Sequence, residues 1–261
     1  MQKSAAEVMA VVRLYDEWTR GAGVTAGVAV RLPGERIASV PDVTAAYARA
    51  LREAGLDPSA LIVARQVHGG VTRAVGASDA VPGIEERGLV IHPSLVCDGL
   101  LTVTPGVTVG VITADCLPVL LRDAAGTAVA AAHAGWRGLA AGILPSAIGA
   151  FAAEAQAPPS TLRAHIGPCI CQACFETGPE VAAAFAEKLG DEARRYAVPG
   201  TGDRIYIDLR GLAALILRRA GVPEAHITQS PDCTCCMPDV YWSHRGHGLQ
   251  RGNQLSLIAL R

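Results

Sequence analysis

The chain has 261 residues, of which 50% are hydrophobic and 18% charged, and its formal net charge is -1. This length and apolar content suffice for one large domain or two tightly joined ones. The near-neutral balance argues against binding to nucleic acid or to an anionic membrane, because such binding needs an excess of basic residues. No apolar run reaches the roughly 20 residues that span a bilayer. The first nine residues lack the basic-then-apolar order of a secretion signal, so we expect a cytoplasmic protein.

The first part of the chain alternates between helix and strand patterns. The predicted elements are a helix over 5–18, a strand over 21–30, a helix over 43–54 and a strand over 61–67. An apolar stripe with helical spacing supports the first helix, and Asp42 and Gly55 can cap the second. The segment 77–98 is irregular and rich in proline and glycine, so it is either a mobile flap or a solvated connector.

The centre of the chain, residues 113–138, reads T-A-D-C-L-P-V-L-L-R-D-A-A-G-T-A-V-A-A-A-H-A-G-W-R-G. Residues 118–123 and the turn residues 124–126 predict one arm and the bend of a β-hairpin. Cys116 and His133 each stand just after an apolar, strand-like run. A rigid sheet can aim side chains at strand ends toward one point, so we consider these two together.

His68 also follows a strand-like run, so three predicted strands end at His68, Cys116 and His133. Two imidazoles and a thiolate form the kind of ligand set used for catalytic zinc, with the fourth position open to water or substrate. Copper accepts similar ligands. The alternative is that each histidine is a hydrogen-bonded strand-end residue and Cys116 a small buried hydrophobe.

The chain contains eight cysteines, and for this length without an export signal we expect reduced thiols. Most of them fall in two groups, which are Cys169, Cys171 and Cys174, and Cys233, Cys235 and Cys236. The two groups could form a second metal site, but small buried thiols or local pairing explain the same residues.

Arg137 stands beside His133 at the start of a predicted Ala-rich helix over 139–155, which Pro145 must kink or restart. A helix N-terminus and a forked cation are the parts of a phosphate site. The alternatives are a structural salt bridge for Arg137 and a core position for Trp136. We favour the phosphate role because Arg137 adjoins a predicted metal ligand.

The remaining elements are a strand over 97–102, a strand over 162–166, helices over 179–189 and 209–220, and two paired closing strands over 241–245 and 255–260. Strands and helices do not alternate regularly enough for a doubly wound sheet, so the expected class is α+β, with mixed β-sheets flanked by helices. No linker or repeat divides the chain, and we expect one domain over 1–261.

Several motifs resemble the signature of the laccase-domain family, also named multicopper polyphenol oxidase or peptidoglycan editing factor. They are Q-V-H-G at 66–69, T-A-D-C-L-P-V-L-L at 113–121, H-A-G-W-R-G at 133–138, I-G-P-C at 166–169, C-F-E-T-G at 174–178, C-T-C-C at 233–236 and S-H-R at 243–245. They span nearly the whole chain in one order, which is more specific than any single motif. The resemblance implies two layers of sheet sandwiched between helices, an α/β/β/α arrangement.

Members of this family are purine nucleoside phosphorylases with adenosine deaminase activity. The resemblance implies Zn2+ held by His68, Cys116 and His133, with Cu2+ as the alternative, and inorganic phosphate as co-substrate. The implied substrates are adenosine, inosine, guanosine and methylthioadenosine. Phosphate would attack C1′ of the ribose during phosphorolysis, and water activated by the metal would attack the adenine ring during deamination.

The resemblance also suggests roles for residues around the three ligands. Asp115, next to Cys116, is the predicted proton shuttle or support for the ligand, unless it is a buried carboxylate bound to the backbone. The predicted catalytic residues are Asp115, Cys116 and Arg137, and the predicted substrate-binding residues are Gln66, Trp136, Arg137 and Arg245. Asn253 stands where the family often has arginine, which removes one possible anion contact. We expect no nucleic acid, membrane or obligate protein partner.

Two other functions stay open. The first is a copper-dependent polyphenol oxidase, as one family name implies, but a multicopper site needs about ten histidine and cysteine ligands from His-x-His pairs. The chain has seven histidines and no such pair. The second is a cysteine hydrolase or amidase acting on peptidoglycan precursors, with Cys116 as nucleophile and His133 or His68 as base.

Overall fold

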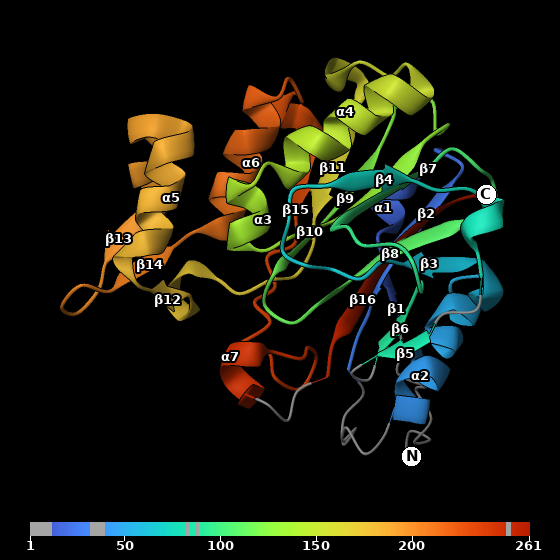
Figure 1. The fold of residues 1–261 in the computed structure, drawn as a ribbon, viewed down its shortest axis with the longest axis horizontal. Helices are drawn as coiled ribbons and strands as arrows, with labels where there is room; N and C mark the ends of the chain where they lie inside the picture. The colour runs from blue at the N-terminus through green and yellow to red at the C-terminus, as the bar shows by residue number, and fades with distance from the viewer. Residues whose placement is uncertain (1–11, 32–39, 82–83, 87–88, 249–251) are drawn as a thin grey trace, which may run out of the picture.

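Two β-sheets pack face to face, and helices cover their outer faces (Figure 1). The computed structural model describes residues 12–31, 40–81, 84–86, 89–248 and 252–261. The first sheet has the order β1–β2–β16–β8–β3, and its strands are β1 (Val12–Leu14), β2 (Val24–Ala29), β3 (Leu61–Val63), β8 (Thr108–Thr113) and β16 (Gln254–Leu260). The second has the order β15–β11–β9–β10–β7–β4, and its strands are β4 (Thr72–Ala74), β7 (Gly99–Thr102), β9 (Leu117–Arg122), β10 (Val129–Ala134), β11 (Arg163–Ile166) and β15 (Ile227–Gln229).

The core lies in three layers because successive residues of a strand point to opposite faces. In β16, Ile258 and Leu260 enter the layer between the two sheets. Leu255 and Leu257 of the same strand face the other way and pack with helix α2 (Val40–Glu53). All seven residues of β16 are buried, so this strand crosses the middle of the molecule.

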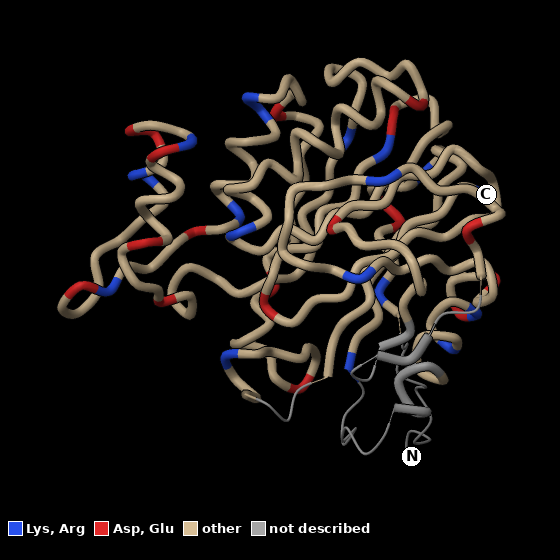
Figure 2. Tube along the Cα trace, in the orientation of Figure 1, with Lys and Arg blue, Asp and Glu red and all other residues tan. Residues whose placement is uncertain are grey.

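The outer face of the second sheet is covered by α3 (Trp136–Ala140), α4 (Ile143–Ala155) and α6 (Leu209–Arg219). Phe151 of α4 and Leu217 of α6 are fully buried in that layer. The predicted α+β class, one domain with mixed sheets flanked by helices, is therefore confirmed. None of the helices in the described ranges is long and apolar enough to cross a membrane. Figure 2 shows acidic and basic residues mixed along the described trace.

A smaller lobe, residues 176–207, extends from one end of the sandwich (Figure 1). It contains β12 (Glu176–Thr177), α5 (Pro179–Leu189), the 3-10 helix η5 (Gly190–Tyr196), β13 (Ala197–Pro199) and β14 (Ile205–Ile207). Helix α5 has the predicted bounds. Helix α6 begins as predicted behind Asp208, whose carboxylate accepts a hydrogen bond from the Gly211 N–H at 3.1 Å.

The short elements are α1 (Asp16–Thr19), α7 (His244–His247), the hairpin β5 (Ile84–Glu86) and β6 (Leu89–Ile91), and the 3-10 helices η1 (Pro58–Ala60), η2 (Ala77–Asp79), η3 (Pro159–Thr161), η4 (Gln172–Cys174) and η6 (Glu224–His226). The predicted β-hairpin at the centre is confirmed, because β9 and β10 pair antiparallel with His133 opposite Pro118.

Two predicted elements are wrong. The predicted helix over 5–18 contains strand β1, which pairs antiparallel with β2, and residues 1–11 lie outside the described ranges. The predicted strand over 241–245 is instead an approach to α7, whose N-cap Ser243 accepts a hydrogen bond from the Gly246 N–H at 2.9 Å. Strand β16 pairs with β2 and β8 in place of that segment.

The predicted helix over 139–155 is two helices. Helix α3 ends at Ala140, and Gly142 takes a left-handed conformation, with φ of 89°, before α4 begins. Pro145 lies in the first turn of α4, where a missing N–H breaks no helical hydrogen bond. The break leaves α3, the helix that contains Arg137, only five residues long.

Candidate metal centre and substrate cavity

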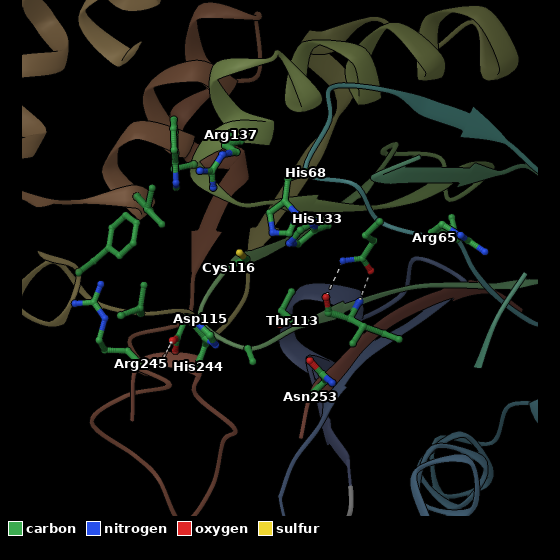
Figure 3. Close-up of a pocket in the computed structure, with 18 of the residues that line it drawn as sticks. Arg65, His68, Thr113, Asp115, Cys116, His133, Arg137, His244, Arg245 and Asn253 are labelled. Carbon is green, nitrogen blue, oxygen red and sulfur yellow. Dashed lines mark hydrogen bonds between the residues drawn. The ribbon is translucent and has the colours of Figure 1, made fainter. Parts of the chain in front are cut away.

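A cavity of about 590 Å³ lies beside the connection between β8 and β9 and the C-terminal end of β10. His68, Cys116 and His133 line it together with Arg137, Arg245 and Asn253. Figure 3 shows that the first three side chains point toward one another, while Arg137 approaches from the side of helix α3. The cavity is therefore bordered by three metal-ligating groups and by cations.

The three predicted ligands meet at one point. One ligand atom from each of His68, Cys116 and His133 lies within 4.8 Å of the other two. The two imidazole rings are 4.8 Å apart, centroid to centroid, and cross edge to face at 78°. Cys116 directly precedes β9, whereas His133 lies inside β10 rather than after it. His68 is five residues beyond the end of β3, so a loop rather than a strand presents it.

Asp98 organises this loop and the buried histidine at the same time. Its carboxylate accepts hydrogen bonds from the backbone N–H groups of Val67, His68 and Gly69 at 3.1, 2.9 and 2.7 Å. The same carboxylate lies 2.8 Å from Nδ1 of His133. Because Nδ1 is occupied, Nε2 of His133 is the nitrogen left for a metal.

The backbone is left-handed at two positions of the site. His68 has φ of 59° and Asp115 has φ of 90°. Such conformations cost a non-glycine residue free energy and persist where the surroundings hold them. The Asp98 hydrogen bonds supply that support for His68. The His68 side chain points toward Cys116 (Figure 3).

Gly135 leaves room for the ligands between β10 and α3. A Cβ atom at this position would lie 2.9 Å from Sγ of Cys116 and 3.3 Å from a ring carbon of His68. The φ of Gly135 is -64°, which any residue can adopt. A glycine is therefore needed here because the Cys116 and His68 side chains lie so close to position 135, and not because of the backbone conformation.

The electrostatics of the site favour a thiolate. Burial opposes ionisation of Cys116, but hydrogen bonds and charge from His133 and His68 outweigh it and lower the pKa of the thiol to about 6. Burial also opposes charging of His133, yet its hydrogen bonds with Asp98 and Cys116 raise the pKa of the imidazole to about 9. Both shifts favour the charged forms of the two side chains, a thiolate at Cys116 and an imidazolium at His133.

The donor set fits zinc. Two imidazole nitrogens and one thiolate are a known catalytic zinc combination, and the histidine that is hydrogen-bonded to Asp98 has the carboxylate–histidine arrangement of many zinc sites. The ligand atoms lie close enough to surround one ion. The adjoining cavity gives access to a fourth coordination position.

Residues 35–261 match the family model described as multi-copper polyphenol oxidoreductase laccase. The chain belongs to this family. The resemblance seen in its sequence motifs is thereby confirmed.

Two curated relatives resemble the chain over most of its length. Adenosine deaminase RL5, from an unknown prokaryotic organism, is 34% identical over 207 residues, which cover 78% of this chain and 76% of that protein. Purine nucleoside phosphorylase YfiH of Escherichia coli (strain K12) is 33% identical over 244 residues, which cover 89% of this chain and 92% of that protein.

Solved structures share the fold. The hypothetical protein YfiH of Bacillus licheniformis superposes with a TM-score of 0.85 at 24% identity, covering 97% of both chains. The protein NMB0706 of Neisseria meningitidis gives a TM-score of 0.79 at 32% identity, covering 96% of this chain and 99% of that one.

In this laccase-family chain, some of the predicted substrate-binding side chains are free to contact a ligand in the cavity, whereas others are already hydrogen-bonded to the protein. Arg137 is exposed, lines the cavity and stacks over Trp136 with its guanidinium carbon 4.3 Å from the ring centroid. Gln66 also lines the cavity, but its side-chain amide donates to the Ile112 carbonyl at 2.8 Å and accepts from the Ile112 N–H at 2.7 Å. Gln66 thus joins its loop to β8.

Arg245 and Asp115 are joined to each other. The Arg245 guanidinium donates to the carbonyls of Cys174 and Glu176, both at 2.9 Å. The backbone N–H of Arg245 donates to the Asp115 carboxylate at 2.6 Å, and the Thr234 hydroxyl donates to its other oxygen at 2.6 Å. Both oxygens of Asp115 are therefore occupied, and one of them is bound to the backbone.

Sequence reasoning missed three residues of the site. Asp98 was assigned to a strand and given no role, although a lone carboxylate before the buried strand β7 was a usable signal. Gly135 lay inside a recognised motif without a stated function. Thr234 also lay inside a recognised motif, C-T-C-C, but only the fold brings it to Asp115.

Proposed function

We propose that this chain is a zinc-dependent purine nucleoside phosphorylase that also deaminates adenosine. The observation that carries this proposal is the meeting of His68, Cys116 and His133 at a cavity that Arg137 also borders. The names of the two curated relatives support both reactions. The cytoplasmic location expected from the sequence stays a prediction.

The cavity offers separate surfaces for a base and for an anion. Ile170, Phe175 and Leu209 contribute apolar lining, which suits the flat face of a purine. Arg137 contributes a guanidinium whose planar fork can donate two hydrogen bonds to one phosphate. We assign the nucleoside base to the apolar side and inorganic phosphate to Arg137.

In phosphorolysis, the side chains of the cavity would hold the reactants in place and stabilise charge. As the glycosidic bond breaks, positive charge develops on the ribose, and Arg137 would hold phosphate in place for its attack on C1′. Stacking on Trp136 limits the directions that the guanidinium can take. When bound, zinc would supply Lewis-acid polarisation and lower the pKa of bound water to near 7.

Asp115 would act through its neighbours rather than as a free base. Its two oxygens hold the Thr234 hydroxyl and the Arg245 backbone, so we assign it to positioning of the Cys116 segment. The predicted role of proton shuttle would require one of these hydrogen bonds to open.

A second candidate function rests on a specific observation. Asp98, His133 and Cys116 have the arrangement of a nucleophile, a base and an orienting carboxylate, and the Cys116 thiol has a pKa of about 6. This is the cysteine hydrolase expected as an alternative. His68 favours the zinc assignment, because a nucleophile activated by His133 does not need a second imidazole.

The test is to incubate metal-analysed protein with adenosine, with and without phosphate, and to separate the products by chromatography. Adenine and ribose 1-phosphate that appear only with phosphate support the phosphorylase, and inosine supports the deaminase. Arg137→Ala should raise the KM for phosphate at least about tenfold while zinc content is unchanged. Arg163→Ala, in β11 and not on the cavity lining, is the matched control and should leave KM unchanged.

Chelation separates the two candidates. If Cys116 is a ligand, removal of zinc abolishes turnover and makes the thiol reactive toward iodoacetamide. If turnover of an amide substrate survives chelation and iodoacetamide then abolishes it, Cys116 is a nucleophile and the zinc enzyme is wrong. Oxidation of a phenolic dye in proportion to copper content would instead support the polyphenol oxidase.

A further inference from the structure

Four cysteines gather outside the cavity at the base of the small lobe. Cys171 is the N-cap of η4 and Cys174 is its last residue, just before the lobe begins, and Cys233 and Cys236 lie between β15 and α7. Their sulfur atoms all lie within 4.8 Å of one another. The spacing is Cys-x2-Cys in both segments, which is the spacing of structural zinc sites.

The sulfur distances fit one tetrahedral ion. With Zn–S bonds of about 2.3 Å, tetrahedral geometry separates the sulfur atoms by about 3.8 Å. Sγ of Cys236 lies 3.9 Å from Sγ of Cys171 and 3.4 Å from Sγ of Cys174. An iron–sulfur cluster distributes its cysteines over several irons and needs a wider set. A disulfide would join the sulfurs in pairs, whereas these four form one group.

Backbone N–H groups and an arginine next to the four cysteines donate hydrogen bonds to sulfur atoms, which stabilises thiolates. The backbone N–H groups of Cys171 and Cys236 point at Sγ of Cys233, at 3.2 and 3.4 Å. Arg210 of α6 donates to the adjacent Cys169 sulfur at 3.1 Å. Four thiolates this close would repel each other without a cation among them.

The geometry points to a second metal site, in which Cys171, Cys174, Cys233 and Cys236 bind one zinc ion with a structural role. All four ligands come from protein, which leaves no open position for substrate. The ion joins the start of the lobe to the segment before α7. These two parts of the chain are far apart along the sequence, since Cys174 and Cys236 are separated by 62 positions.

This site reaches the cavity through two hydrogen bonds already described. Thr234, next to ligand Cys233, binds Asp115, and Arg245 binds the carbonyl of ligand Cys174. Asp115 precedes Cys116, a ligand of the first site. Zinc at the four cysteines thus holds the wall of the cavity that contains Arg245, and its loss should lower kcat/KM without removing zinc from His68, Cys116 and His133.

Metal analysis of the full chain by mass spectrometry tests the proposal. Wild-type protein should contain two equivalents of zinc, and Cys171→Ser/Cys174→Ser should contain one. Cys235→Ser is the matched control, because Cys235 belongs to the same segment but not to the four-sulfur group, and it should retain both equivalents. A double variant that keeps both equivalents would overturn the proposal.

A second variant covers the case in which the cysteine changes prevent folding. His68→Ala/Cys116→Ala removes two ligands of the first site and should retain one equivalent of zinc. Cobalt bound in its place should give the intense thiolate charge-transfer absorption of four sulfur ligands. Absence of zinc from this variant, iron in place of zinc, or a disulfide between these cysteines in freshly purified protein would each reject the assignment. These readouts do not depend on turnover, so the site stands or fails separately from the proposed function.

Discussion

The absence of a side chain at Gly135 allows the end of the strand that contains His133 to lie close to Cys116. A side chain there would occupy the space between the Cys116 sulfur and the His68 ring. Packing around metal ligands tolerates little displacement, because the positions of the donor atoms set the affinity. The glycine is therefore as much a part of the site as the ligands are.

Gly135→Ala should weaken zinc binding at the first site at least about tenfold, since the new methyl group displaces the sulfur or the imidazole. Competition with a chromophoric chelator measures this affinity. Gly149→Ala is the control: Gly149 lies in α4, and a methyl group added to it would have no neighbouring atom within 4 Å. Alanine there should stabilise the helix by about 0.5–1 kcal/mol. Equal zinc affinity in the two variants would contradict the prediction.

Asp98→Asn should also weaken zinc binding, by about 10–100-fold, because the acceptor that orients His133 loses its charge. The control is Asp123→Asn. Asp123 is a buried carboxylate that holds the β9–β10 turn through the N–H groups of Thr127 and Ala128, at 2.8 and 2.9 Å. Its replacement should lower the free energy of unfolding by about 1–3 kcal/mol and leave zinc affinity intact. If both variants lost zinc equally, general destabilisation would explain the effect of Asp98.

The sequence predicted that His68, Cys116 and His133 share one site because each follows a strand-like run and belongs to a family motif, and the structure brings the three together. It did not identify Asp98 or Thr234, because their roles depend on partners distant in the chain. The Asp98 carboxylate is hydrogen-bonded to His133, 35 residues away, and the Thr234 hydroxyl donates to Asp115, 119 residues away. A hydrogen bond over such a separation leaves no periodic pattern in the sequence.

Among the elements, those with local signals were predicted best. Helix α5 has proline in its first turn and glycine at its end, and α6 has an aspartate cap, so their bounds are set by neighbouring residues. Strand β1 was mistaken for helix because the apolar residues of the wider segment 5–18 have helical spacing, whereas Val12 and Leu14 show the strand spacing of two over only three residues. Pairing with β2 decides between the two, and that partner is not local.

Strand β11 carries a pH-sensitive residue between the sheets. His165 packs against the rings of Tyr15 and Trp18, with centroids 4.1 and 5.8 Å away, and its Nδ1 lies 2.9 Å from the Thr228 hydroxyl. Burial lowers the pKa of this imidazole to about 4. No charged side chain in the described ranges forms an ion pair with it.

The folded protein should therefore lose stability as the pH falls from about 6.5 to 4, because the unfolded chain binds the proton first. The contribution of His165 is present above pH 6.5 and amounts to about 3 kcal/mol when fully lost. His165→Asn keeps a partner for Thr228 and should flatten this part of the curve. Urea unfolding of both proteins across the pH range measures the difference, and parallel curves would show that His165 does not titrate in this way.

At the scale of the whole molecule, the first sheet brings together strands from both ends of the described chain, β1 and β2 from one end and β16 from the other. Strand β16 lies between β2 and β8, pairing Ser256 with Val28 on one side and with Val111 on the other. It also contributes to the layers on both faces of its sheet. Both layers of apolar packing thus depend on one strand.

Deletion of residues 254–261 should abolish cooperative unfolding, because it opens the centre of the sheet and both adjoining layers. Circular dichroism during urea titration tests this. A synthetic peptide with the sequence of residues 252–261 should restore the transition by strand addition, and a scrambled peptide should not. A truncated chain that still unfolds cooperatively without peptide would show that β16 is dispensable.

The central place of β16 also has a consequence during synthesis on the ribosome. Strands β2 and β8 emerge long before their shared neighbour, so each presents an unpaired edge to the cell while translation continues. Chaperones that shield such edges would have their longest contact with this protein at those two strands. The nascent chain gains its finished sheet, and with it the cavity, only when β16 has been added.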